Sequence, residues 1–157
     1  MRTWAPRGKT PILRMPLSHD HLSVISAITR DGRVVLPVRK DSYDGEAVVG
    51  FLRLLLRKIS GKLLLIWDGS PIHHGQAVKD FLREGAAKRW HLEQLPGYAP
   101  DLTPDEGMWN SLRRVELATV CCTDLDDLRH HLLRAGVRLR HTPEVIRACA
   151  RQCVYLV

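Results

Sequence analysis

Residues 65–113 constrain the fold of this chain more than any other segment. An apolar strand within LIWDGSPIHH places Asp68 at its end, and the loop of LEQLPGYAPDLTPDEGMWNSLR places Glu106 at the start of a helix. In an α/β domain, groups at the carboxyl ends of strands lie at one edge of the sheet, where ligands bind. Carboxylates at that edge are the hard oxygen ligands that a two-metal phosphoryl-transfer site requires. The two residues are therefore the candidate catalytic pair and candidate metal ligands.

The first part of the chain predicts a β-hairpin followed by a helix. Residues 22–29 and 34–38 are apolar and β-branched, and they flank Asp31-Gly32, a strong turn pair. Apolar residues then recur at helical spacing over residues 47–59, and Asp44 is suited to cap the start of this helix.

The second part of the chain alternates strands and helices. Residues 62–67 (KLLLIW) predict a strand buried on both faces, and Thr103, Pro104 and Glu106 predict a helix start with a capping box. Other expected elements are a helix over 74–84, a strand over 91–95, a loop over 96–104, and helices beginning near 123 and 142. This order is that of a ribonuclease H-like (retroviral integrase-like) α/β fold, a mixed sheet with flanking helices, without its first central strand. We expect one domain over residues 1–157.

Basic charge is concentrated at the two ends of the sequence. The chain carries a net charge of +7, with eight Lys and Arg in residues 1–40 and six arginines in residues 129–151. Such clustering favours a polyanion partner such as DNA, although a solvated basic surface explains it equally well. No apolar run approaches membrane-spanning length and no secretory signal opens the sequence, so we expect a cytoplasmic protein without membrane contact.

The four cysteines form an adjacent pair at 121 and 122 and a pair one helical turn apart, Cys149 and Cys153. Two histidines lie between the pairs, so a zinc site is conceivable. Buried reduced thiols are the interpretation we favour, because free cysteine behaves as a small core hydrophobe.

Each candidate acid also has an ordinary structural explanation. Asp68 precedes a glycine, and Asp-Gly is a common turn pair. A capping box explains Glu106 without any catalysis. His73 and His74 follow Asp68 and are typical of a helix entry, although a histidine beside carboxylates also suits metal or phosphate binding. The pair of acids, separated by 37 residues, is harder to explain without a site because both lie on one side of the expected sheet.

Two motifs resemble those of the DDE transposases of bacterial insertion sequences, in the mariner-like superfamily. WDGSPIHHGQAVKDFL is similar to the second-aspartate motif of that family, and LPGYAPDLTPDEGMWNSLRR is similar to the motif that ends in its catalytic glutamate. Asp68 and Glu106 fall on these two catalytic positions. RTWAPRGKTPIL resembles the segment that follows the family's first catalytic aspartate, so the resemblance covers essentially the whole chain.

This resemblance implies a metal-dependent enzyme that cleaves and joins DNA strands during transposition. It implies two Mg²⁺ or Mn²⁺ ions as cofactors, and element ends and target DNA as partners. The first catalytic aspartate and its strand have no counterpart, and Asp20 is the substitute to consider. Asp101 and Asp105 flank Glu106 as further candidates. We therefore expect a catalytic domain that is truncated at its N-terminus, lacks a helix-turn-helix domain and is inactive alone.

DNA contacts are expected from Tyr98, by stacking on bases, and from Arg7, Lys9, Arg113 and Arg114, through phosphates. The resemblance further implies a bacterial protein that is nucleoid-associated when bound to DNA, as a homodimer or joined to an upstream transposase segment. Two alternatives stay open. One is a non-catalytic DNA-binding remnant, and the other is a metal-dependent nuclease of the same fold that cuts DNA without joining ends.

Overall fold

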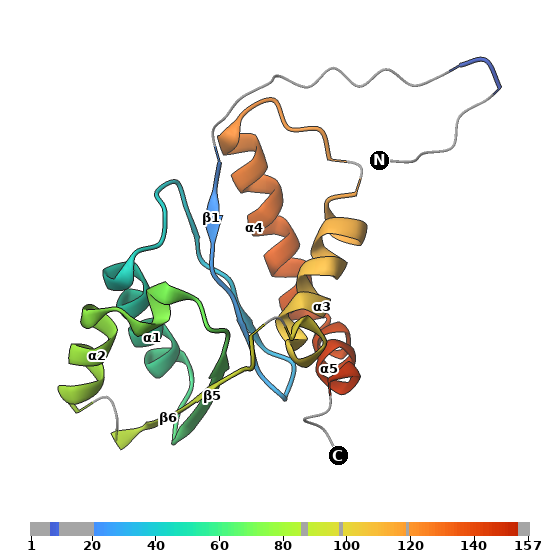
Figure 1. Cartoon of the computed structure of the whole chain (residues 1–157). Coiled ribbons are helices and arrows are strands. Elements are labelled where there is room, and N and C mark those ends of the chain that lie inside the picture. The colour runs from blue at the N-terminus through green and yellow to red at the C-terminus, as the bar shows by residue number, and fades with distance from the viewer. Residues whose placement is uncertain (1–6, 10–20, 86–87, 98, 119, 154–157) are drawn as a thin grey trace.

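The structure is a computed structural model that describes residues 7–9, 21–85, 88–97, 99–118 and 120–153. Short strands form the middle of the molecule, with helices on both sides of them (Figure 1). Among the described residues, no helix has the length and apolar character needed to cross a membrane. The strands are β1 (Ser23–Val24), β2 (Ala27–Ile28), β3 (Val34–Val35), β4 (Val38–Arg39), β5 (Leu63–Trp67) and β6 (Trp90–Gln94). The helices are α1 (Gly45–Lys58), α2 (Gln76–Arg83), α3 (Pro104–Ser111), α4 (Leu125–His141) and α5 (Pro143–Gln152).

The predicted hairpin is present, but each of its arms is broken into two short strands. β1 pairs with β4 and β2 pairs with β3, both in antiparallel orientation. The prediction of one continuous strand over residues 22–29 and another over 34–38 was therefore wrong. Pro37 lies in the break, where it has no N–H to donate to a neighbouring strand. The turn was predicted correctly: Gly32 has a φ of +94° and donates its N–H to the carbonyl of Thr29.

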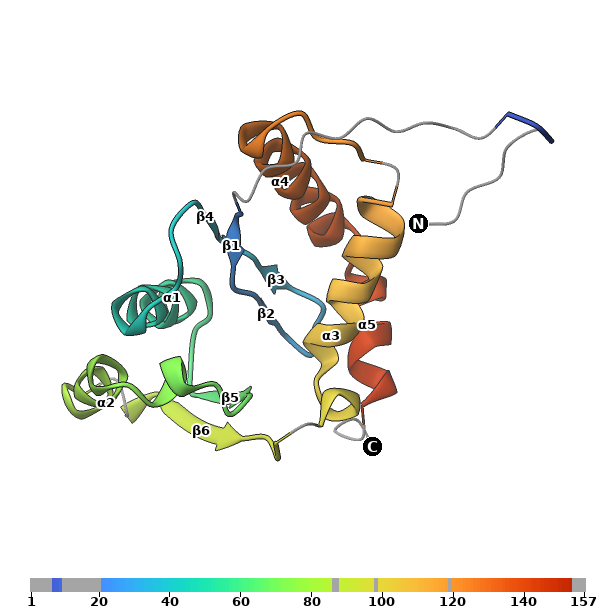
Figure 2. The same cartoon turned by 45° about the horizontal axis from the view of Figure 1, so that its top comes forward.

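The hairpin separates the hydrophobic core into two clusters (Figure 2). Val34 and Val35 are neighbours in β3, so their side chains point to opposite faces. The α3–α5 cluster lies on the Val34 face, and its buried members are Val34, Leu36, Met108, Leu112, Leu132, Ala135, Leu139, Ile146 and Cys149. The α1–α2 cluster lies on the Val35 face, and its buried members are Val35, Val48, Val49, Phe51, Leu52, Leu55, Val78, Phe81 and Trp90.

β5 and β6 form a parallel pair that has no ladder with the hairpin in the described part of the chain. Trp67 lies opposite Gln94, so both strands end at the same edge. The continuous mixed sheet that we predicted is not formed by these ladders. Residues 62–67 were also predicted to be buried on both faces, and this was wrong, because the α1–α2 cluster covers one face only. On the other face, Leu64 is 60% exposed and Ile66 is 37% exposed.

α1 begins and ends close to its predicted bounds. The carboxylate of Asp44 accepts a backbone N–H of the first turn at 2.8 Å, as predicted for a helix cap. At the other end, the guanidinium of Arg89 donates to three backbone carbonyls, those of Leu56 at 3.1 Å, Ile59 at 2.6 Å and Gly61 at 2.9 Å. This side chain therefore joins the end of α1 to the start of β6.

α3 departs from its prediction at both ends. Thr103 precedes the helix but forms no capping box, because its hydroxyl donates to the carbonyl of Ala99 at 3.3 Å. At the other end the helix widens into a π-helical turn, Leu112–Glu116, which shifts the register of the following side chains. Val115 is therefore 71% exposed, whereas Met108 is completely buried.

α4 and α5 pack against the hairpin and α3. α4 is capped by Asp124, one residue after the predicted Thr123, and the Asp124 carboxylate accepts the N–H of Asp127 at 2.8 Å. α5 begins at Pro143, as predicted, and touches the hairpin turn there. A Cβ on Gly32 would lie 2.7 Å from the carbonyl oxygen of Pro143, so only glycine fits this contact.

Candidate active site

Asp68 follows β5 directly, at the edge where β5 and β6 end. Two groups converge on its Oδ1, the backbone N–H of Ser70 at 3.0 Å and Nε2 of His73 at 3.1 Å. Within the described residues no hydrogen bond reaches its Oδ2, and the side chain is 67% exposed. Gly69 lets the end of β6 come close, since a Cβ there would lie 2.9 Å from Nε2 of Gln94. One oxygen of Asp68 is thus held and the other is open to a ligand.

His73 is packed between Asp68 and the last residue of β5. Its ring stacks on Trp67, with ring centroids 4.7 Å apart and an interplanar angle of 17°. Nδ1 of His73 is buried and has no hydrogen-bond partner in the described part of the chain. Burial lowers the pKa of His73, and the Asp68 carboxylate opposes this effect. The sequence alone favoured an ordinary helix-entry histidine, and no local signal indicated this packing.

Glu106 lies in the first turn of α3 and its side chain is exposed. Among the described residues its carboxylate takes part in no hydrogen bond or ion pair, so the capping-box explanation of this residue is not supported. The carboxylate is free for a ligand. The backbone that carries it is held in the first turn of α3, where the N–H of Glu106 donates to the carbonyl of Thr103.

Asp105 anchors the start of α3 to the hairpin. Its Oδ2 accepts the Ser26 hydroxyl at 2.5 Å and the Trp109 indole N–H at 2.9 Å, and Ser26 lies in the break between β1 and β2. Burial raises the pKa of Asp105, although both hydrogen bonds lower it. Sequence reasoning treated Asp105 as a further candidate ligand and missed this anchoring role. The signal was the spacing of Asp105 and Trp109, because residues four apart are neighbours on a helix surface.

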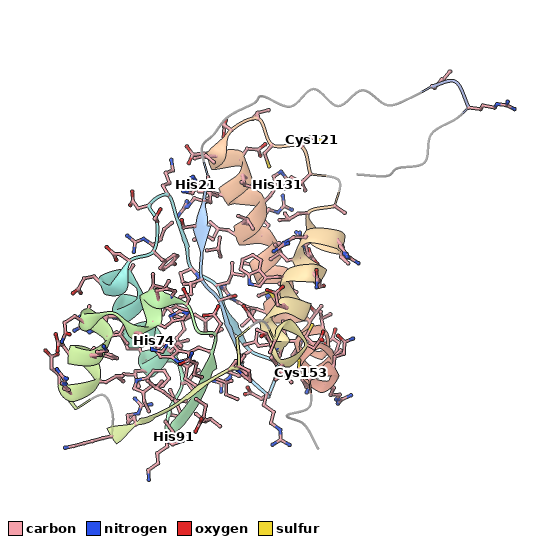
Figure 3. All side chains as sticks on the ribbon, viewed as in Figure 1. His21, His74, His91, Cys121, His131 and Cys153 are labelled. Carbon is pink, nitrogen blue, oxygen red and sulfur yellow. The ribbon has the colours of Figure 1, made fainter. Side chains whose placement is uncertain are left out.

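No group of three His, Cys, Asp or Glu side chains in the described part of the chain is placed to hold a metal ion. The hard oxygens of Asp68 and Glu106 suit Mg²⁺ or Mn²⁺ as two of its ligands. The zinc alternative is not supported: Cys121 lies near the start of α4 and Cys153 lies at the end of α5 (Figure 3). Cys149 and Cys153 are buried as predicted, but Cys121 is exposed.

The predicted DNA-binding residues are exposed wherever the structure describes them. Arg113 and Arg114 lie on the π-helical turn after α3, and Arg7 and Lys9 lie in the short described stretch near the start of the chain. Tyr98 and Asp20 fall outside the described residues. The C-terminal helices carry a further exposed set, which consists of Arg129, Arg134, Arg138, Arg140, Arg147 and Arg151.

The chain is similar to an endonuclease superfamily in sequence and to solved transposase structures in fold. The family model described as "DDE superfamily endonuclease" matches residues 1–129. No curated protein matches the chain. The Mos1 mariner paired-end complex with Mn superposes with a TM-score of 0.63 at 19% identity, covering 99% of this chain and 51% of that chain. The Mos1 strand transfer complex gives a TM-score of 0.59 at 16% identity, covering 100% of this chain and 51% of that chain.

A shorter solved structure matches over a similar length. The catalytic domain of the Mos1 mariner transposase superposes with a TM-score of 0.54 at 17% identity, covering 85% of this chain and 80% of that domain. At these identities the similarity shows the fold alone, which is that of transposase catalytic domains. The chain spans about half the length of the transposase chains in the two DNA complexes.

Proposed function

Because the chain belongs to the DDE superfamily of endonucleases, we propose that it forms the catalytic part of a transposase that cleaves and joins DNA strands. The observation that carries this proposal is that two carboxylates have oxygens without a hydrogen-bond partner among the described residues. Asp68 at the end of β5 and Glu106 at the start of α3 each present oxygen that no described protein group engages. Asp105 differs in its burial: Ser26 and Trp109 both donate to its Oδ2, and its Oδ1, which has no partner in the described residues, is closed off from solvent rather than open to a ligand.

We assign Asp68 and Glu106 as two ligands of Mg²⁺ or Mn²⁺. When bound, such a metal would activate water or a DNA 3′-hydroxyl as nucleophile and stabilise the leaving oxygen. Arg113 and Arg114 follow Glu106 by about two helical turns, and their exposed guanidinium groups would bind DNA phosphates near the reacting strand.

A third carboxylate is needed, and the described residues supply none beside this pair. We place it on an additional strand between the hairpin and β5, contributed by an upstream transposase segment. Two features support this position. In the described part, β2 pairs only with β3 and β5 only with β6, so each leaves one edge without a partner. Ala27 of β2 and Leu65 of β5 nevertheless pack on the same α1–α2 cluster.

The test is DNA cleavage by two proteins, residues 1–157 and the same chain extended by the codons upstream of Met1. If those codons encode an apolar strand carrying an aspartate, the extended protein should nick plasmid DNA with Mg²⁺ or Mn²⁺, while residues 1–157 should not. Asp68→Asn and Glu106→Gln should each abolish nicking. Asp80→Asn is the matched control, because Asp80 is an exposed acid on α2 that bonds Gln76 and Arg83.

Different outcomes would correct different parts of the proposal. If residues 1–157 cleave DNA and Asp68→Asn stops the reaction, the additional strand is unnecessary and Asp20 is the first residue to examine. If the extended Asp68→Asn protein still cleaves, the assignment of Asp68 is wrong. Cleavage without joining of a 3′-hydroxyl end to target DNA would indicate a nuclease of the same fold.

A second function, DNA binding without catalysis, is favoured by the lack of a three-ligand group among the described residues. The exposed arginines of α4 and α5 would then act alone. Their phosphate contacts release counterions, so affinity for duplex DNA should fall steeply between two salt concentrations. Salt-sensitive binding by a protein that never cleaves DNA, even when extended, would favour this function.

A further inference from the structure

His73 has the contacts of a residue that orients Asp68. Its ring is stacked on Trp67 with centroids 4.7 Å apart, and its side chain is only 13% exposed, so the ring is held in one orientation. From that position Nε2 lies 3.1 Å from Oδ1 of Asp68. The backbone N–H of Ser70 reaches the same oxygen at 3.0 Å. Both contacts therefore act on one carboxylate oxygen and leave the other unengaged.

The buried side of the ring indicates which nitrogen carries the proton. Nδ1 is buried and has no hydrogen-bond partner within the described residues. A proton on Nδ1 would be a buried donor without an acceptor, which is unfavourable, whereas a proton on Nε2 meets the Asp68 carboxylate. The geometry thus favours the neutral tautomer with its proton on Nε2, the ring nitrogen that lies 3.1 Å from Oδ1.

We propose that His73 is a positioning residue that fixes the Asp68 carboxylate so that Oδ2 alone is presented to a divalent cation. The inference rests on the proposed function, in which Asp68 is a metal ligand. Holding one oxygen of a ligating carboxylate by hydrogen bonds sets the direction of its other oxygen before the metal arrives. Asp68 needs such support because its side chain is otherwise 67% exposed and follows the last residue of a strand.

The chain offers matched variants for a test. His73→Phe keeps a ring that can stack on Trp67 and removes the donor. It leaves no polar group unpaired at Nδ1, since that atom has no partner in the described residues. His73→Gln restores a donor, because its amide nitrogen is the same number of bonds from Cα as Nε2. His74→Phe is the control: His74 is exposed and meets Trp67 edge-on at 6.2 Å.

Two measurements decide the question, the first on residues 1–157 and the second on the extended protein of the cleavage test. Long-range ¹H–¹⁵N spectra without metal should show the proton of His73 on Nε2. Titration with Mn²⁺ alone, followed by the EPR signal of the free ion, should show binding that Asp68→Asn weakens. His73→Phe should weaken it about tenfold or more, as loss of an outer partner of a metal ligand typically does. His73→Gln should recover most of the affinity and His74→Phe should not change it, with equal thermal unfolding for all variants.

The outcomes separate this inference from the proposed function. If Asp68→Asn weakens Mn²⁺ binding but His73→Phe does not, or if the proton is on Nδ1, His73 does not position Asp68 and the inference is wrong while the proposed function stands. If the extended protein and its Asp68→Asn variant bind Mn²⁺ with equal affinity, Asp68 is not a ligand, and the proposed function fails together with the inference.

Discussion

The two candidate metal ligands, Asp68 and Glu106, are held in place by different kinds of contact. Asp68 is held by groups close to it in sequence, the N–H of Ser70 and the ring of His73, and these act on the carboxylate itself. The Glu106 carboxylate takes part in no hydrogen bond or ion pair in the described part of the chain. It is held through Asp105, which binds Ser26 of the hairpin 79 positions away in sequence.

The contacts near Asp68 set the direction of its carboxylate, whereas those near Glu106 set the position of the helix that carries it. Near Asp68, a substitution can change the direction of the carboxylate while the fold persists, because the contacts are local and the region is exposed. Near Glu106, a substitution that moves the carboxylate must disturb packing in the α3–α5 cluster. Substitutions near Glu106 should therefore lower the free energy of unfolding more than substitutions near Asp68.

The largest expected effect is on the Glu106 side. Met108→Ala removes a completely buried side chain from α3 and should lower the free energy of unfolding by about 2–5 kcal/mol. Leu64→Ala, in the strand before Asp68, should lower it by less than about 1 kcal/mol, because Leu64 is 60% exposed. Urea unfolding measures both. Equal losses would mean that the uncovered face of β5 is packed in solution.

An intermediate effect tests whether the Asp68 side has a long-range anchor of its own. Arg89→Met leaves the carbonyls of Leu56, Ile59 and Gly61 without their charged donor, and should lower the free energy of unfolding by about 1.5–3 kcal/mol. Arg83→Met is the control, since its exposed pair with Asp80 should contribute less than about 1 kcal/mol. If the two variants unfold alike, the Arg89 contacts add no net stability.

The smallest expected effect lies in the turn of the hairpin whose strands contribute to both clusters. The Thr29 hydroxyl and the Arg33 guanidinium lower the pKa of Asp31, so the ionised carboxylate stabilises the folded state. Asp31→Asn should therefore reduce stability by less than about 1 kcal/mol at neutral pH, because the pair is exposed. Since the folded pKa is lowered, the difference should disappear as the pH falls through it, below the ordinary aspartate value of about 3.9. Urea unfolding at neutral and at acidic pH checks this, and a difference that persists in acid would assign the effect to the turn conformation.

Much of the architecture followed from short-range sequence signals. The Asp44 cap, the glycine turn at residue 32, the strand that ends at Asp68 and the helix that carries Glu106 were all predicted from neighbouring residues. The physical reason is that caps, turns and amphipathic periods depend on backbone preferences within a few residues.

Other features depend on which distant segments meet. The exposed face of β5, the register shift that turns Val115 outward and the bond from Ser26 to Asp105 have no local signature. An apolar run such as residues 62–67 indicates a strand, but whether one or both of its faces are covered depends on the helices that pack there. Likewise, Asp68 and Glu106 were predicted as site residues from the sequence, whereas the contact of His73 with Asp68 depends on how the loop after β5 folds back onto Trp67.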